Sequence, residues 1–228
     1  SSAVRFAVIL SISMEFLQSF MDIVLHLDTH LSELVGQYGL LTYVILFSIV
    51  FAETGLVVTP FLPGDSLLFA AGSFAGLGML DIAYLMLLLF IAAVLGDTLN
   101  YYLGKKIGLK VLKWKIGSKQ LVKQKYIDQT HEFYEKYGAK TIIIARFVPI
   151  VRTFAPFVAG IGEMNYKKFI SFNMIGGGLW VASLLLLGYL FGGLEIVKNN
   201  FEAVIFGIIF LSILPIMIEF IKHRIKKQ

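Results

Sequence analysis

The run from Phe51 to Gly72 is almost wholly apolar, yet it contains the carboxylates Glu53 and Asp65 and the prolines Pro60 and Pro63. A helix that spans a bilayer needs about 20 mostly apolar residues with few charges. Proline inside a helix removes a hydrogen bond and clashes with the preceding turn. In hydrocarbon, broken backbone is tolerated only where it is buried in protein or lines a wet cavity. The run therefore predicts a helix followed by a re-entrant hairpin, with its carboxylates facing an interior site.

A second run, Ile144 to Gly162, has the same character with the opposite charge. It contains Arg146, Arg152, Pro149 and Pro156 among apolar residues. By the same reasoning it predicts a second re-entrant hairpin, which carries guanidinium groups instead of carboxylates.

The two runs align on a Phe-x-Pro motif, Phe61-Leu62-Pro63 in the first and Phe154-Ala155-Pro156 in the second. Glu53 and Arg146 precede their motifs by the same spacing. Weak internal similarity of this kind is typical of inverted-repeat transporters, in which the binding site lies near the midplane where the repeats meet. We therefore expect an all-α polytopic membrane protein whose two opposed re-entrant hairpins are related as an inverted repeat.

Composition supports a membrane protein. Of 228 residues, 57% are hydrophobic and 15% charged, and mean hydropathy is +0.80, whereas a soluble domain is about 45–50% apolar and about 25% charged. The absence of cysteine excludes disulfides, thiolate metal sites and cysteine nucleophiles. The net charge of +5 is concentrated in two segments, which indicates membrane topology and lipid contact and not nucleic-acid binding.

The chain divides into three expected parts. Residues 1–13 are an extension before Met14, 14–38 form an amphipathic interfacial helix, and 39–228 form one membrane transport domain. Within this domain we expect four spans, two hairpins and a basic loop with its own helix from a Ser118 cap to Tyr137. The spans are 39–58, 82–103, 165–190 and 201–221, the hairpins are about 59–75 and 141–162, and the loop is 105–140.

Orientation follows from the lysines of the 105–140 loop and from the basic tail at 222–227. The positive-inside rule places that loop in the cytoplasm, with its lysines near anionic headgroups. Two further spans then return the C-terminus to the cytoplasm. The two hairpins consequently enter from opposite faces of the membrane.

Glu53, Asp65, Arg146 and Arg152 are the charged groups on these membrane-embedded elements. Charges at the centre of a bilayer cost roughly 2.5–3.5 kcal/mol each on insertion scales, so they mark pathways or ion pairs. The set predicts an anion site in which the arginines hold a phosphate and a carboxylate takes up a proton. An ion-pair network that only locks the hairpins together is the structural alternative, and Asp65 after Gly64 could equally cap the second hairpin arm.

Further polar candidates surround this set. Asp97 and Asn100 lie one helical turn apart on an expected span and either face the same cavity or bond to neighbouring helices, with a structural role slightly favoured. Thr59, Thr153 and Ser66 could donate to a ligand, although local backbone capping is the commoner role of such residues.

Enzyme chemistry and metal binding find little support. His26 and His30 are spaced as a metal pair, but no third ligand is near them in sequence. The sequence has no nucleophile elbow, zinc-protease, phosphate-loop or dinucleotide motif. We therefore expect a protein that is not an enzyme, with no cofactor and no metal.

The chain resembles the DedA family of bacterial inner-membrane proteins from about Met14 to its C-terminus. The matching motifs are ETGLVVTPFLPGDSLLF at 53–69, Gly96-Asp97-x-x-Asn100-Tyr, and ARFVPIVRTFAPF-x-AG at 145–160. The resemblance implies two opposed re-entrant hairpins and proton-dependent transport of lipid head groups, including undecaprenyl phosphate and phospholipids such as phosphatidylethanolamine. It also implies that Glu53, Asp65, Arg146 and Arg152 are essential.

Our hypothesis is therefore a lipid flippase. Its arginines bind the head group, with Thr59, Thr153 and Ser66 as further donors, and Glu53 and Asp65 couple to protons. Two alternatives stay open. One is a proton-dependent small-cation or drug antiporter. The other is a membrane scaffold in which the buried polar residues have only a structural role. The sequence also leaves open a homodimer.

Overall fold

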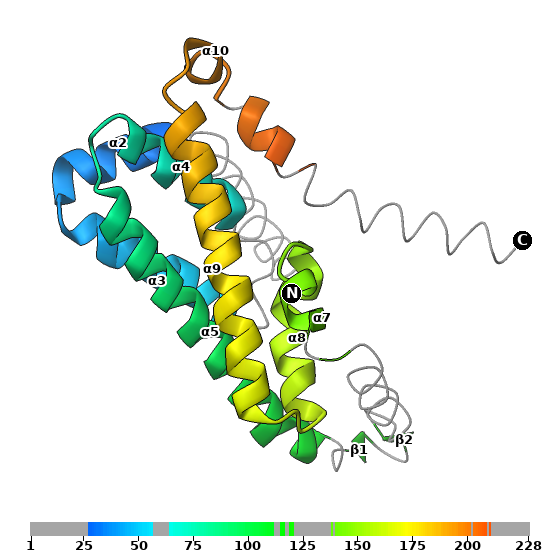
Figure 1. Ribbon diagram of the computed structural model, residues 1–228. Coiled ribbons are helices and arrows are strands. Elements are labelled where there is room, and N and C mark those ends of the chain that lie inside the picture. Colours follow the sequence, from blue (N-terminus) through cyan, green and yellow to red (C-terminus); the bar gives the residue numbers. More distant parts are fainter. Residues whose placement is uncertain are drawn as a thin grey trace, which may run out of the picture.

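The computed structural model describes residues 27–56, 64–111, 115–116, 119–120, 138, 140–201, 203–208 and 210. Within these ranges the fold consists of helices joined by turns, with one short antiparallel ladder (Figure 1). The helices are α2 (Leu27–Tyr38), α3 (Leu41–Gly55), α4 (Gly64–Gly76), α5 (Ile82–Val111), α7 (Lys140–Ala145), α8 (Pro149–Ile161), α9 (Tyr166–Phe191) and α10 (Glu195–Lys198). Strands β1 (Lys115–Ile116) and β2 (Lys119–Gln120) pair antiparallel.

Two long helices, α5 with 30 residues and α9 with 26, organise the molecule. Each has a stretch long and apolar enough to cross a membrane by length and composition, Ile82–Ile107 and Tyr166–Phe191. Two of the shorter helices make contacts between the N-terminal and C-terminal halves of the chain. Helix α4 from the first half packs on α9, and α8 from the second half packs on α5, while α3 also lies against α5. One short helix of each half, α4 and α8, therefore rests on the long helix of the other half.

Glycines permit these two crossings. A Cβ at Gly188 of α9 would overlap the carbonyl oxygen of Phe69 in α4, and a Cβ at Gly104 of α5 would overlap the carbonyl oxygen of Phe157 in α8. The α8 side of the second crossing has its own glycine, Gly160, against the carbonyl of Tyr101. Small residues at helix interfaces let backbones approach closely, which is the usual means of helix packing in membranes.

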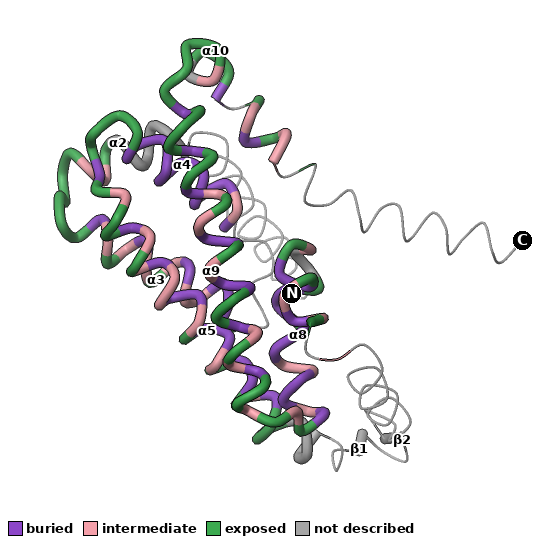
Figure 2. The backbone as a smooth tube through the Cα atoms, in the orientation of Figure 1, coloured by how far each residue is buried: buried purple, intermediate pink, exposed green. Residues whose placement is uncertain are grey.

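The buried apolar side chains form two clusters. The larger joins α3, α4, α5 and α9 around fully buried leucines such as Leu68, Leu85 and Leu185. The smaller lies where α5, α8 and α9 meet, with the rings of Tyr101 and Phe169 stacked 4.6 Å apart. Figure 2 shows that buried residues line the faces that the helices turn toward one another, and exposed residues lie outside.

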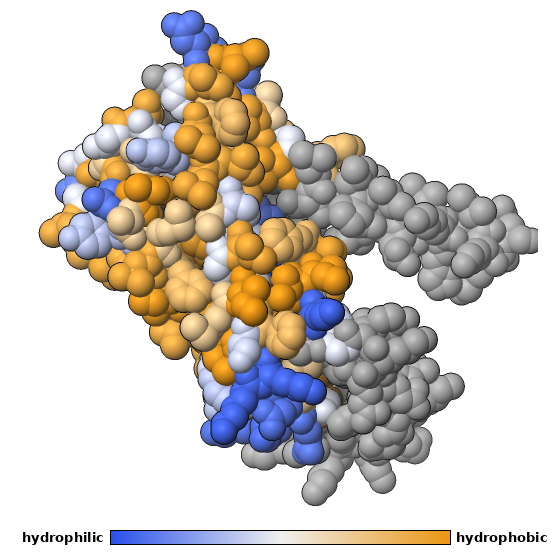
Figure 3. All heavy atoms as spheres, in the orientation of Figure 1, coloured by the Kyte–Doolittle hydropathy of each residue, from blue (hydrophilic) through white to orange (hydrophobic). Residues whose placement is uncertain are grey.

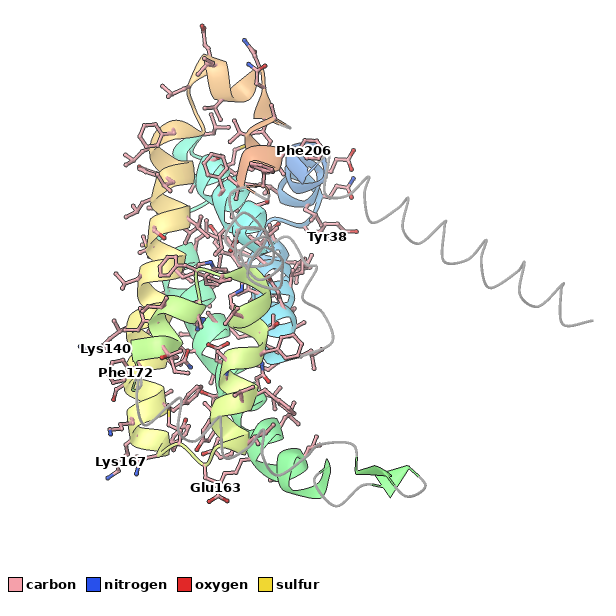
Figure 4. The ribbon with its side chains drawn as sticks, turned by 90° about the vertical axis from the view of Figure 1, so that its right-hand side faces the viewer. Tyr38, Lys140, Glu163, Lys167, Phe172 and Phe206 are labelled. Atoms are coloured by element: carbon pink, nitrogen blue, oxygen red, sulfur yellow. The ribbon has the colours of Figure 1, made fainter. Side chains whose placement is uncertain are left out.

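A broad apolar band covers most of the surface seen in Figure 3, and hydrophilic residues gather toward its ends. Exposed Lys105, Lys106, Lys167 and Lys168 come from the end where α5 finishes and α9 begins. Figure 4 shows Lys167 at this end, with Phe206 toward the opposite one. The distribution is the one expected of a helix bundle that crosses a bilayer.

Two helix starts follow the sequence prediction. Asn165 accepts hydrogen bonds from the backbone N–H groups of Lys167 and Lys168 at the start of α9, and Asp81 does the same for Ala83 and Tyr84 at the start of α5. The residues from Gly192 to Asn200 form a mostly exposed turn that includes the single helical turn α10.

Other boundaries differ from expectation. Helix α5 does not stop near Leu103 but continues to Val111, because its intrahelical bonding carries on through Gly104. Helix α3 has only 15 residues, fewer than a full span needs, although the expected span was 39–58. The predicted helix from Ser118 is wrong at its start, because Lys119 and Gln120 pair with β1 instead.

Several predictions fall on residues outside the described ranges. These are the extension 1–13, the first half of the N-terminal helix with His26, the tip of the first hairpin with Thr59, the rest of the Ser118 helix, and most of the 201–221 span with the basic tail.

The Asn165 cap provides a direct test of the start of α9. Asn165→Ala is expected to lower the free energy of unfolding by about 1 kcal/mol, because two N–H groups in the first helical turn lose their acceptor. Asn165→Asp keeps the acceptor and should stay near wild type. Denaturant unfolding of the purified protein measures both, and equal stability of the alanine and aspartate variants would contradict the cap.

Candidate functional site

Five ionisable side chains from separate elements meet inside the bundle. They are Glu53 of α3, Asp65 of α4, Asp97 of α5, Arg146 in the turn after α7, and Arg152 of α8. All except Asp65 are buried, and Asp65 is half-buried. Since charges removed from water are costly unless they are paired, their pairing determines what this site can do.

Arg152 bridges the two halves of the chain. Its Nη2 donates to Oε1 of Glu53 at 2.5 Å, and its Nη1 donates to Oδ1 of Asp65 at 2.6 Å. The planar guanidinium fork therefore holds one carboxylate from α3 and another from α4. Gly64, which opens α4, lies so close to the Glu53 carboxylate that any Cβ there would overlap it.

Arg146 has different partners. Its Nη2 donates to Oδ2 of Asp97 at 2.6 Å and to Oδ1 of Asn173 in α9 at 2.8 Å. Asn173 is itself held, because its Nδ2 donates to the carbonyl of Val94 at 3.2 Å. This second ion pair thus fixes the turn after α7 to both long helices.

Trp180 of α9 touches both ionic groups. Its Nε1 donates to Oδ1 of Asp65 at 2.8 Å. The Cζ atoms of Arg152 and Arg146 lie 4.6 Å and 5.7 Å from the centre of its ring. An indole ring near a guanidinium attracts it electrostatically, so Trp180 stabilises both cations without neutralising either.

Asn100 connects the backbone around the site. Its Nδ2 donates to the carbonyl of Thr54 in α3 at 3.1 Å and to that of Thr153 in α8 at 2.7 Å. Each carbonyl belongs to the residue next to one member of the Glu53–Arg152 pair. Asn100 therefore holds the backbones of α3 and α8 at the separation that this ion pair requires, which is a structural role.

Several buried polar atoms around the pairs have no hydrogen-bond partner within the described part of the protein. They include Ser66 Oγ, Asp97 Oδ1, Asn100 Oδ1, Arg146 Nη1 and Arg152 Nε. Buried polar groups are nearly always satisfied by protein, water or ligand. The site therefore retains donors and acceptors for a polar ligand beyond its internal ion pairs.

The structure brings all but one of the predicted site residues together; the exception is Thr59, which lies outside the described residues. Glu53, Asp65, Arg146 and Arg152 converge as expected, Asp97 joins them as a direct partner of Arg146, and Asn100 borders them. Thr153 and Ser66 are both buried there, on α8 and α4.

Two residues of the site were missed. Asn173 and Trp180 lie seven positions apart on α9, so they share one helical face. An amide and an indole on the same face of an otherwise apolar helix were the only available signal. Each alone is unremarkable, and only the packing of α9 against α5 and α4 gives them partners.

A helical bundle with paired charges inside an apolar shell is typical of an integral membrane protein. Comparison with known proteins identifies the family. Residues 62–190 match the family model described as VTT domain. The chain belongs to this family, the DedA family, as its motifs indicated.

Among its relatives, Protein DedA of Escherichia coli (strain K12) is 51% identical over 92% of this chain and 96% of its own length. An uncharacterized membrane protein of Mycobacterium leprae (strain TN) is 42% identical over 75% of each chain. The inner membrane protein YqjA of Escherichia coli (strain K12) is 37% identical over 66% of this chain and 67% of its own. No solved structure matches the chain.

Proposed function

We propose that this protein is a flippase of the bacterial inner membrane, which moves a phosphate-bearing lipid head group across the bilayer and couples this movement to protons. The observation that carries the proposal is Arg152, a buried guanidinium whose two nitrogens are occupied by carboxylates from two different helices. Proton coupling enters through these carboxylates.

A phosphate binds a guanidinium fork with the same bidentate geometry as a carboxylate. Glu53 and Asp65 therefore compete with a phosphate for Arg152, since both of its Nη atoms are already engaged. Protonating a carboxylate removes its charge and frees the guanidinium. Proton uptake thus favours phosphate binding, and release of the protons restores the internal ion pairs.

Charge balance supports the same exchange. With every group ionised, three carboxylates face two guanidiniums in the described site, which leaves one negative charge in excess. A site with this balance repels a phosphate until it has taken up at least one proton. One proton makes the site neutral and a second gives it a net positive charge, so the positive charge that would attract an anion exists only after two protons have been taken up.

The architecture supports passage between leaflets. Helix α4 packs on α9 and α8 packs on α5, so one short helix of each half rests on the long helix of the other, as expected if the two hairpins enter from opposite faces and are related as an inverted repeat. We place the basic end, with Lys105, Lys106, Lys167 and Lys168, in the cytoplasm, where it would contact anionic lipids. The lipid tail stays in the hydrocarbon while the head group passes the buried site.

The experiment that tests the function measures head-group transfer in proteoliposomes with a pH gradient, with fluorescent phosphatidylethanolamine and undecaprenyl phosphate as alternative probes. Glu53→Gln keeps a side chain of the same shape but cannot change charge, so the response of transfer to the gradient should be weakened, with only Asp65 left to exchange protons beside Arg152. Lys168→Gln, on the exposed surface of α9, is the matched control and should respond as wild type. A Glu53→Gln protein with an unchanged response would contradict the proposed coupling.

The excess of carboxylates is also the observation that favours the second candidate, a proton-dependent small-cation or drug antiporter. A cation, like a proton, would neutralise the extra charge. Both Glu53 and Asp65 are already held by Arg152, however, and the described residues contain no group of three acidic or histidine ligands for a metal ion. Proton-driven cation flux without lipid movement in the same vesicles would select this candidate.

A further inference from the structure

We infer that Arg146 is a second anion site, separate from Arg152, and that Asp97 is its exchangeable counter-ion. A head group would then occupy two positions in sequence, one at each guanidinium. The lipid identity of the anion rests on the proposed function. The existence of the second site does not, because it concerns the binding of any phosphate.

The two arginines have separate counter-ions. In the described residues, Arg152 pairs with Glu53 and Asp65, and Arg146 pairs with Asp97, with no carboxylate shared between them. Protonation of Asp97 would therefore free Arg146 and leave the Arg152 pairs in place. Two guanidiniums with a common carboxylate could not be released independently in this way.

The Arg146 position has the features of a built site. Arg146 is 2% exposed, and its Nη1 has no hydrogen-bond partner in the described part of the chain. On the same ion pair, Asp97 is 3% exposed and its Oδ1 also lacks a partner. A pair that served only to lock helices would be expected to satisfy both groups, because orphaned buried donors and acceptors are costly.

The surroundings keep the guanidinium in place when its carboxylate leaves. Asn173 accepts from the same Nη2 atom that binds Asp97, so Arg146 retains a neutral partner. Gly177 lies beside this group, where an added Cβ would be 3.2 Å from Nη2. Because Gly177 carries no side chain, α9 packs directly against the buried guanidinium.

Trp180 connects the two positions. Both guanidinium Cζ atoms lie within 6 Å of its ring centre, so an anion that leaves one arginine for the other stays beside the same indole. The other charged groups of the site come from four elements around α5. They are Glu53 of α3, Asp65 of α4, Arg146 of the turn after α7 and Arg152 of α8, while α9 adds the neutral Asn173 and Trp180.

The inference is tested by measuring the binding of dodecyl phosphate to the protein by calorimetry at pH 7. Asp97→Asn keeps the shape and removes the competing charge, so affinity should rise about tenfold, since a charge-assisted bond to the internal carboxylate no longer has to be displaced. The gain should persist in Asp97→Asn/Arg152→Gln and disappear in Asp97→Asn/Arg146→Gln. A folded Asp97→Asn protein with unchanged affinity, or a gain lost only with Arg152→Gln, would overturn the second site.

Stoichiometry provides a measurement that does not depend on the Asp97 variant. At acidic pH the wild type should bind two dodecyl phosphates per chain, and Arg146→Gln and Arg152→Gln should each bind one. One phosphate per chain in the wild type would refute the inference. Two phosphates in a protein that moves no lipid would refute the proposed function and leave the second site standing.

Discussion

Lysine in place of Arg152 is expected to lower the rate of lipid head-group transfer at least about a hundredfold, although the positive charge is retained. The guanidinium of Arg152 holds Glu53 and Asp65 through two different nitrogens that point in fixed directions. A lysine ammonium is a single compact charge on a flexible stem, so it cannot reproduce this fork or bind a phosphate through two parallel bonds.

The measurement is initial transfer rate in proteoliposomes under a pH gradient, with protein orientation and amount matched. Thermal unfolding in detergent shows whether the lysine variant remains folded, as expected when the net charge of the site is preserved. Lys168→Arg makes the reverse exchange on the exposed surface and should transfer at the wild-type rate. Full transfer by a folded Arg152→Lys protein would show that Arg152 contributes charge alone, and the exchange mechanism would be wrong.

The charged members of the site were accessible from sequence because hydrocarbon makes unpaired charges expensive. Glu53, Asp65, Arg146 and Arg152 each interrupt an apolar run that also contains prolines, and this local conflict marks them. Their grouping into pairs was not accessible. Arg152 lies 99 residues from Glu53 along the chain, and only the crossing of α8 and α5 beside α3 brings them together.

Asp97 illustrates the same limit. Its sequence context left open a cavity role and a bond with a neighbouring helix, with the structural role slightly favoured. In the structure it is the carboxylate partner of Arg146, whereas Asn100, one turn away, holds backbone carbonyls. The different roles of Asp97 and Asn100 depend on which residues of the α7–α8 region face each turn of α5. The sequence of α5 alone does not predict them.

Some helix starts could be predicted from local sequence and others could not. The starts at Asp81 and Asn165 follow from side chains that bond to N–H groups two or three residues on, so local sequence was sufficient. Ser118 carries the same local signal, but Lys119 and Gln120 pair with β1. A capping residue indicates where a helix can begin, and pairing with another segment decides whether it does.

Alanine in place of Gly188 is expected to destabilise the fold by about 3 kcal/mol or more, because an added Cβ would overlap the carbonyl oxygen of Phe69 and the obstructing atom belongs to the backbone of α4. A flexible side chain could move aside, but α4 cannot shift without displacing Asp65, which is bonded to both Arg152 and Trp180. The substitution therefore separates the two halves of the chain at the crossing that positions the site.

Gly178→Ala is the matched control, since it lies on the same helix and its Cβ would meet only the Phe90 ring at 3.7 Å. Alanine favours a helix by about 1 kcal/mol over glycine, so this variant should be as stable as wild type or slightly more stable. Thermal unfolding monitored by size-exclusion chromatography measures both proteins. If the two alanine variants melt together, α4 and α9 do not make the close contact from which the position of Asp65 beside Arg152 follows.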